Sequence, residues 1–223
     1  MQIAPLLQIG RGITALVGGG GKTTLMYTLA EELKSRGRVI ICTSTKIRLP
    51  EQYLTLFGAS EDDITAAFQT NAILCVAEKT AEEKLCAPLL PFGTLAQLAD
   101  YVIVEADGAK CLPLKAHASH EPVIPEEAQR VVMVMGIDGI GKPIAEVCHR
   151  PSLYAQLAHA SESDSVTPEL AARVVNTEGF GDRIYVNKVE DAAAYDAALS
   201  LADYFTCPVV SGSLHKGVYV CLH

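Results

Sequence analysis

The sequence contains no tryptophan, and aromatic residues make up only 6% of its 223 residues. No stretch approaches the roughly 18 consecutive apolar residues that a membrane-spanning helix needs, and we expect no signal peptide and no membrane partner. Basic residues are in the minority, because 18 Lys and Arg stand against 26 Asp and Glu, for a net charge of −8. With this balance of charges we expect no fold-wide basic surface, and therefore no nucleic acid as a partner. A polyanionic ligand would need a local arrangement of amides and cations.

The seven cysteines form no C-x-x-C pair, and their number is odd. Most of them lie inside apolar runs, as Cys42 does after Val39, Ile40 and Ile41. Such cysteines are typical of reduced, mostly buried thiols rather than of a disulfide framework or a zinc site. The sequence therefore predicts a cytoplasmic protein.

Short apolar runs rich in Val and Ile alternate with helical patterns along the chain. Near-continuous apolar strands favour a parallel sheet that is covered on both faces. The expected strands are 13–17, 38–43, 72–77, 101–106, 130–135, 183–187 and 208–211. The expected helices are 22–35 and 191–205, with shorter ones at 61–69, 94–99, 152–159 and 168–176.

This alternation predicts an α/β fold: a three-layer, doubly wound, mainly parallel sheet with its ligand at the carboxyl ends of the strands. No internal repeat or linker marks a boundary, and the length favours one domain over residues 1–223. Insertions are expected around 44–70 and 108–129.

A glycine-rich block follows the first expected strand and precedes a helix. Its residues are Gly18, Gly19, Gly20, Gly21, Lys22, Thr23 and Thr24. Successive glycines let backbone N–H groups approach an anion, and the helix terminus adds its dipole. Lys22 would reach the β- and γ-phosphates, and the Thr23 hydroxyl would bind Mg²⁺. The strict phosphate-loop pattern lacks its first glycine, where Leu16 stands. The dinucleotide fingerprint G-x-G-x-x-G fails here, which argues against NAD.

Two carboxylates, Glu105 and Asp107, end the strand expected at 101–106. Their i, i+2 spacing places both on the same side of an extended strand. In a phosphate-loop protein such a carboxylate holds Mg²⁺ or orients the attacking water, and Asp107 is the metal candidate with Glu105 close behind. The alternative is an ordinary strand-ending turn, because Asp-Gly is common there.

Two further groups are weaker candidates. Thr45 and Lys46, after the second expected strand, could sense the γ-phosphate or Mg²⁺, or could belong to a strand cap. After the strand at 183–187, an Asn-Lys pair and two acids resemble a guanine-reading edge, with Ser211 on the next strand. The residues of that second group are Asn187, Lys188, Glu190, Asp191 and Ser211. Its alternative is a plain strand-to-helix turn with an acidic helix start.

The loop after Asp107 carries two lysines, Lys110 and Lys115, which could contact a phosphate or an acidic second substrate. Cys111, His117 and His120 match no closed zinc site, and these loop residues are expected to be solvated.

Six segments recur in the order known from one family. They are Gly-Gly-Gly-Gly-Lys-Thr-Thr (18–24), Thr-Ser-Thr-Lys-Ile (43–47), Val-Glu-Ala-Asp-Gly-Ala-Lys (104–110), Leu-Pro-Leu-Lys-Ala (112–116), His-Glu-Pro-Val-Ile-Pro (120–125) and His-Arg-Pro (149–151). The chain resembles, over most of its length, the selenium-dependent hydroxylase accessory family (selenium cofactor biosynthesis protein YqeC). The resemblance implies a phosphate-loop NTPase of the bacterial cytoplasm, associated with the maturation of selenium-dependent molybdenum hydroxylases. A molybdenum hydroxylase or another maturation factor is then the implied protein partner.

The sequence thus predicts an Mg²⁺-dependent nucleotide-binding protein, a slow NTPase with GTP or ATP, that assists the assembly of a cofactor. Lys22, Asp107 and Glu105 would carry the chemistry. One alternative is a kinase whose acceptor pocket includes Lys110, Lys115, His120 and Arg150. The other is a non-catalytic module whose bound nucleotide stabilises a surface for a partner.

Overall fold

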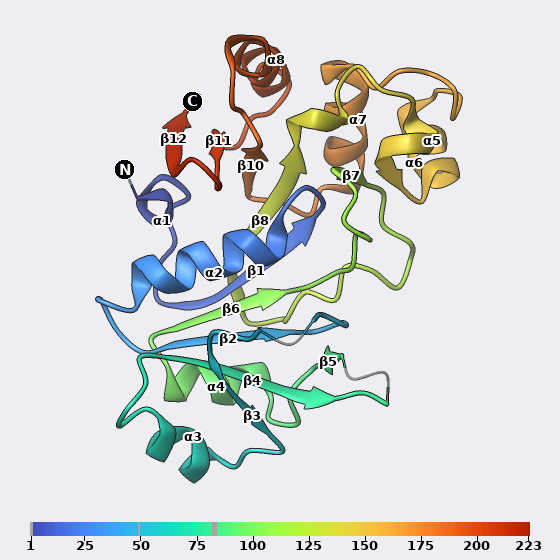
Figure 1. Cartoon of the computed structure of the whole chain (residues 1–223). Coiled ribbons are helices and arrows are strands. Elements are labelled where there is room, and N and C mark those ends of the chain that lie inside the picture. Colours follow the sequence, from blue (N-terminus) through green and yellow to red (C-terminus); the bar gives the residue numbers. More distant parts are fainter. Residues whose placement is uncertain (1, 49, 82–83) are drawn as a thin grey trace.

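The computed structural model describes residues 2–48, 50–81 and 84–223. Its main sheet runs in the order β12-β11-β10-β8-β1-β6-β2-β4-β3, and β5 pairs with β4 (Figure 1). The central strands are β1 (Gly12–Gly18), β6 (Tyr101–Glu105), β8 (Ala128–Gly136), β2 (Val39–Thr43), β4 (Ile73–Lys79), β10 (Arg183–Asn187) and β11 (Val209–Ser213). These seven match the seven expected strands. All pairs among them are parallel, which confirms the predicted α/β fold with a mainly parallel sheet.

The strands that the sequence did not predict are short or lie at sheet edges. They are β3 (Leu54–Phe57), β5 (Leu85–Cys86), β7 (Leu114–Lys115), β9 (Cys148–His149) and β12 (Val218–Cys221). Two to four residues are too few to show a strand period. β5 and β12 pair antiparallel with their neighbours, whereas β7 and β9 form a separate parallel pair. Of the two expected insertions, 44–70 contains β3 and 108–129 contains β7.

The helices confirm the six expected segments within a few residues at their ends. These are α2 (Lys22–Leu33), α3 (Glu61–Ala67), α4 (Phe92–Leu98), α6 (Pro151–Ala158), α7 (Pro168–Glu178) and α8 (Ala192–Ala202). The short helices α1 (Ile3–Leu6), α5 (Ile144–Val147) and the 3-10 turn η1 (Ile137–Gly139) were not predicted. The structure contains no described helix that is both long and apolar enough to span a bilayer.

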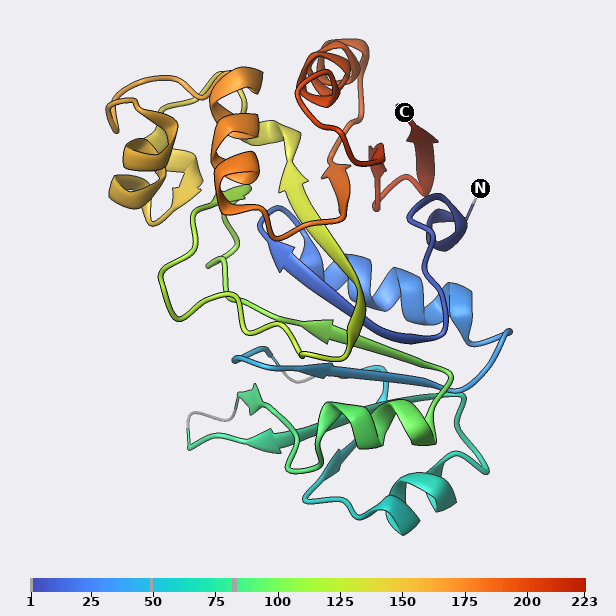
Figure 2. The same cartoon turned by 180° about the vertical axis from the view of Figure 1, so that it is seen from behind.

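The helices cover both faces of the sheet, so the molecule has three layers. On one face, Leu25, Met26 and Leu29 of α2 pack with α1 against apolar strand side chains. On the other face, α3 and α4 cover one half of the sheet and α5 to α8 the other half. Figures 1 and 2 show α2 and α4 on opposite sides. This double covering explains why the strands read as continuous apolar runs.

The connections around β1 leave this strand's carboxyl end open to a ligand. The chain leaves β1 into α2 on one face, and it leaves β8 toward α5–α7 on the other face. In doubly wound sheets a crevice forms where successive connections leave toward opposite faces. The glycine block lies at this place, directly after β1.

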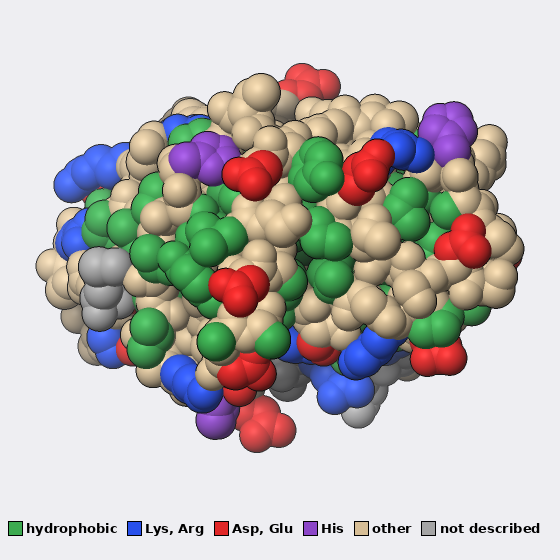
Figure 3. All heavy atoms as spheres, turned by 90° about the horizontal axis from the view of Figure 1, so that it is seen from above, with side chains coloured by type: hydrophobic (Ala, Val, Ile, Leu, Met, Phe, Trp, Pro, Cys, Tyr) green, Lys and Arg blue, Asp and Glu red, His purple; other side chains and the backbone are tan. Residues whose placement is uncertain are grey.

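The face that carries α8 and β12 mixes hydrophobic side chains with scattered acidic and basic ones (Figure 3). Its exposed hydrophobic residues include Tyr195, Leu199, Val218 and Val220. The buried charged residues near the carboxyl end of β1, among them Lys22 and Asp107, differ in character from this surface.

Candidate functional site

The glycine block is packed so closely that side chains could not replace its hydrogens. A Cβ on Gly18 would come within 2.4 Å of the Val134 carbonyl oxygen, and one on Gly20 within 2.3 Å of the Gly136 nitrogen. Both glycines also have positive φ, +96° and +74°. Their identity is therefore fixed by the approach of other backbone segments as well as by the turn.

Three of the amides that we expected to face an anion are used inside the protein. The Gly18 N–H donates to Asp107 Oδ2 at 2.9 Å, and Gly19 and Gly20 donate to the carbonyls of Val134 and Leu112. The nucleotide-binding role of Gly18, Gly19 and Gly20 stays a prediction, because in this structure their N–H groups bind other parts of the protein. The first three hold the loop in place, because nearby acceptors in the fold already satisfy them.

The next four amides form the available cradle. None of the hydrogen bonds among the described residues uses the N–H of Gly21, Lys22, Thr23 or Thr24 as a donor. They open α2, a helix of 12 residues whose N-cap Gly21 provides no side-chain cap. Free amides and the positive end of the helix dipole point the same way, so this terminus can bind an anion.

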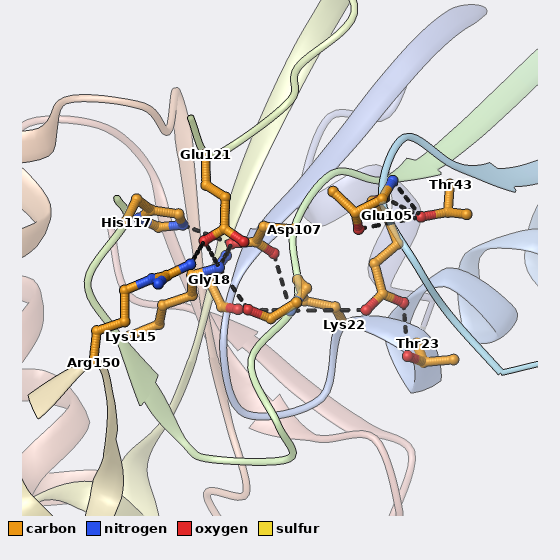
Figure 4. A network of polar contacts seen from close by, with 12 residues as sticks. Gly18, Lys22, Thr23, Thr43, Glu105, Asp107, Lys115, His117, Glu121 and Arg150 are labelled. Atoms are coloured by element: carbon orange, nitrogen blue, oxygen red, sulfur yellow. Dashed lines mark hydrogen bonds and ion pairs between the residues drawn. The ribbon is translucent and has the colours of Figure 1, made fainter. Parts of the chain in front are cut away.

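Lys22 is buried and lies between the loop and two carboxylates. Its Nζ donates to the Gly18 carbonyl at 2.6 Å and lies 3.0 Å from Asp107 Oδ1 and 3.8 Å from Glu105 Oε1 (Figure 4). The sequence-predicted residues Lys22, Glu105 and Asp107 are therefore brought together. A lysine held only by side-chain charges and one carbonyl can exchange those partners for phosphate oxygens.

Asp107 is the centre of the charge network. Its Oδ2 lies 2.6 Å from His117 Nε2 and 3.2 Å from Lys115 Nζ, in addition to the Gly18 amide. Oδ1 has only the Lys22 ion pair, which lacks hydrogen-bond geometry. Burial raises the pKa of Asp107, but the charges of Lys22, His117 and Lys115 outweigh it and hold this pKa well below its usual value.

Glu105 lies in a different environment although it is only two residues away. Its Oε2 accepts the Thr23 hydroxyl at 2.7 Å, and burial raises its pKa against the opposing influence of Lys22. Thr23 therefore faces Glu105 and not Asp107. The charge of Asp107 is already balanced by cations, whereas Glu105 is a buried carboxylate with a hydroxyl beside it. The metal pair of Thr23 and Asp107 that the sequence predicts stays a prediction.

His117 extends the network to α7. Its Nδ1 lies 2.8 Å from Glu178 Oε2, and its backbone N–H donates to Glu178 Oε1. Burial lowers the pKa of His117, but the hydrogen bonds with Asp107 and Glu178 raise it above its ordinary value. The expectation of a solvated loop histidine was wrong, because the ring is buried between two carboxylates.

Lys115 was also expected in a solvated loop and is instead fully buried. Its Nζ contacts Asp107 and Glu121 Oε2, at 3.2 and 2.8 Å, and donates to the Gly108 carbonyl. Arg150 Nη2 lies 2.8 Å from the same Glu121 oxygen. The i, i+2 spacing of Lys115 and His117 was the sequence signal that could have indicated their shared contact with Asp107. Glu178 gives no such signal, because its partner His117 is 61 residues away in the chain.

Asn187 contacts the loop rather than an open base-binding edge. Its Nδ2 donates to the Gly20 carbonyl at 2.7 Å, and its Oδ1 accepts from Tyr185 Oη and the Leu214 amide. The side chain is buried, and both acceptor positions are filled. Ser211, on β11, is fully buried. In this structure neither side chain presents a polar group at the surface, and the base-reading role of these two residues stays a prediction.

The remaining members of that group make helix and surface contacts. The Asp191 carboxylate accepts the Ala194 amide at 2.8 Å as the N-cap of α8, which is the acidic helix start weighed as the alternative. Glu190 accepts from the Ser213 hydroxyl, and Lys188 pairs with Asp138 at 2.8 Å. Lys188 and Glu190 are exposed.

The residues after β2 form a strand cap. The Thr45 amide donates to Thr43 Oγ1, which itself donates to the carbonyl of Glu105. Thr45 is half-buried and Lys46 is exposed. Their role as a phosphate or Mg²⁺ sensor stays a prediction.

Fold and site together define a three-layer α/β protein with a phosphate-loop motif after its first central strand. The model of the YqeC protein family matches residues 14–152, and the chain belongs to this family. It is 33% identical over 153 residues to the uncharacterized protein YqeC of Escherichia coli (strain K12). That match covers 65% of this chain and 60% of the length of the relative.

Two solved structures share the general arrangement at 17% identity. The signal recognition particle 54 kDa protein of Aeropyrum pernix K1, in complex with GDP, aligns with a TM-score of 0.42 over 95% of this chain and 44% of its own. The signal recognition particle receptor FtsY of Elizabethkingia anophelis aligns with a TM-score of 0.41 over 94% and 62%.

Proposed function

We propose that this protein binds a nucleoside triphosphate with Mg²⁺ at the amino end of α2 and hydrolyses it slowly. The observation that carries this proposal is the set of free amides at Gly21, Lys22, Thr23 and Thr24, next to a buried lysine and a carboxylate. Anions bind at such helix termini through backbone N–H groups. The nucleotide is GTP or ATP.

The residues present fit Mg²⁺. This ion prefers oxygen ligands, and it is usually held by one or two carboxylates or hydroxyls together with phosphates and water. The Thr23 hydroxyl and Glu105, 2.7 Å apart, would hold it. The burial that raises the pKa of Glu105 would be offset by a nearby cation. When bound, Mg²⁺ would neutralise charge on the phosphate oxygens.

The side chains divide the remaining tasks. Lys22 would leave Gly18 and bind the terminal phosphate oxygens, stabilising the charge that develops there. Asp107, whose pKa is held low, is a weak base, so it acts as a positioning residue for the Gly18 amide and for Lys22. Glu105 is the carboxylate that can orient water near the phosphate.

A panel of ATP, GTP and CTP, with and without Mg²⁺, tests binding by thermal shift. A ligand at about 100 times its Kd stabilises the folded state by about 2.7 kcal/mol. Lys22→Ala should abolish the shift, whereas Lys34→Ala should keep it, because Lys34 lies at the other end of α2 and pairs only with Glu31. No shift with any nucleotide would overturn the proposal.

Phosphate release from the bound nucleotide tests the enzymatic step. Glu105→Gln should bind nucleotide in an Mg²⁺-independent manner and release little phosphate. Tight binding without release by the unaltered protein would instead favour a non-catalytic docking module.

We further propose, from the family resemblance, that the nucleotide-dependent step belongs to the maturation of selenium-dependent molybdenum hydroxylases. The chain spans 60% of its curated relative, so this role is proposed for the matched region only. Co-purification with a molybdenum hydroxylase that depends on the nucleotide state would support it, and equal recovery with Lys22→Ala would count against it.

A further inference from the structure

A second group of cations lies beside the phosphate loop, on the far side of Asp107 from Lys22. The parallel pair β7·β9 places Lys115 opposite His149, and Arg150 follows directly. Lys115 and Arg150 meet on one oxygen, Oε2 of Glu121 (Figure 4). Lys110 lies close enough to His149 to lower its pKa, after burial and the charges of Lys115 and Arg150. Positive charge therefore gathers at one point of a protein whose net charge is −8.

The bonding in this group of charged residues is incomplete. Arg150 uses Nη2 on Glu121, but its Nε is buried without a hydrogen-bond partner. Guanidinium groups recognise carboxylates and phosphates best through two parallel N–H donors. Glu121 engages only one of them, so an oxyanion that approached Arg150 side-on would satisfy a donor that the protein leaves unused.

Glu121 is the replaceable member of the group. Its side chain remains 14% exposed, while that of Lys115 behind it is fully buried. It belongs to the loop between β7 and β8, and both its cation contacts use Oε2. Asp107 also pairs with Lys115, but it is shared with Lys22, His117 and the Gly18 amide, and no contact joins it to Arg150 among the described residues.

We propose that Arg150 and Lys115 form the binding site for the carboxylate or phosphate group of a second substrate, and that Glu121 fills this site when the substrate is absent. The incoming oxyanion displaces the Glu121 carboxylate, takes Nε and Nη2 of Arg150, and keeps the ion pair with Lys115. Lys115 and Lys22 contact opposite oxygens of the same Asp107 carboxylate. The second substrate would thus lie next to the proposed nucleotide.

This placement rests on the proposed function, whereas the binding of the anion does not. If the anion binds and no nucleotide does, the oxyanion site stands and the nucleotide proposal fails. If nucleotide binds and no second anion does, the nucleotide proposal stands and the oxyanion site is wrong. Both together favour a transfer in which an oxygen of the acidic acceptor, in place of water, bonds to the terminal phosphorus as the bond to the leaving nucleoside diphosphate breaks.

The test uses the full chain without nucleotide, titrated calorimetrically with inorganic phosphate and, separately, with succinate at constant ionic strength. Lys22→Ala serves as the background, because it removes phosphate binding at the loop. Glu121→Gln should bind the anion about tenfold more tightly than the background protein, since a competing charge is removed. Adding Arg150→Gln should abolish binding, whereas Arg173→Gln, an arginine paired with Glu169 on α7, should not.

A direct readout covers the case in which these variants unfold. The Nε–H resonance of Arg150 in the unaltered protein should shift when phosphate is added. The shift should occur both with the loop saturated with nucleotide and with the loop empty. Preference for phosphate or for succinate identifies the group that the substrate carries. If Glu121→Gln is folded and binds neither anion more tightly, or if the resonance does not move, the cation group is a structural ion network and the proposal is wrong.

Discussion

The two sides of the phosphate loop are held by different kinds of contact. On the β6 side, Asp107 binds the Gly18 amide and Lys22 within a buried ionic network. On the β10 side, Asn187 binds the Gly20 carbonyl through a neutral amide whose acceptor positions are filled. Both sides were predicted to contact a nucleotide, yet the contacts to the loop itself are ionic on the first side and neutral on the second.

This difference indicates that the β6 side can contact a ligand, whereas the β10 side positions the loop. Ion pairs such as Lys22–Asp107 leave Oδ1 without a hydrogen bond, so a phosphate can compete for the lysine. The Asn187 Oδ1 accepts from two donors and its Nδ2 donates to the Gly20 carbonyl, and breaking these bonds would expose buried polar groups at a cost of about 1–3 kcal/mol each. Asn187 therefore fixes the shape of the loop, and the β6 side responds to the ligand.

The largest expected effect comes from removing the charge of Asp107. Asp107→Asn leaves Lys22 and Lys115 without their shared counter-charge and weakens the contact with His117, and should destabilise the fold by about 3–5 kcal/mol. Urea unfolding measures this loss.

Glu105→Gln is the matched control for Asp107→Asn on the same strand end. It keeps an acceptor for the Thr23 hydroxyl and removes a charge that burial disfavours, so we expect a change within about 1 kcal/mol. Equal losses of stability in the two variants would contradict the view that cations balance the charge of Asp107 but not that of Glu105.

Asn187→Ala should have the next largest effect. It leaves the Gly20 carbonyl and the Leu214 amide without partners, and should cost about 2–3 kcal/mol of stability. Nucleotide affinity should fall by the same factor for ATP and GTP, because the side chain holds the loop and does not read the base. Calorimetric titration with both nucleotides measures this, and a selective loss of GTP binding would support the base-reading interpretation.

The sequence predicted the parts of the fold and site that are local along the chain. The central strands were predictable because each is a run of apolar residues, and Lys22, Glu105 and Asp107 follow strands in recognisable order. Contacts between distant segments were not predictable. Asn187 meets Gly20 across 167 residues, and His117 meets Glu178 across 61. These partners decide whether a polar residue is a ligand contact or a structural bond.

The pH dependence of stability tests the ionic side further. The folded-state pKa of His117 is raised by its hydrogen bonds with Asp107 and Glu178, against the lowering effect of burial. Its contribution is therefore complete below the unfolded pKa of about 6.5 and is lost as the pH rises through the folded pKa.

As the pH rises from about 6.5 through the folded-state pKa of His117, we expect the unfolding free energy of the unaltered protein to fall relative to that of His117→Gln. Urea unfolding at a series of pH values measures the difference. His149 titrates in both proteins, so subtraction isolates His117. A constant difference between the two profiles would show that the ring is not charged in the folded protein.

The smallest expected effect lies on the β10 side. Asp191→Ala removes the N-cap of α8 and should cost about 1 kcal/mol, the usual value for a lost side-chain cap. Because its carboxylate accepts the Ala194 amide, we expect unchanged affinity for every nucleotide. Asp191→Asn should restore most of the stability, since an amide oxygen can also cap a helix. If Asp191→Asn instead weakens GTP binding while the fold stays stable, this acid reads the base and the β10 side takes part in ligand recognition.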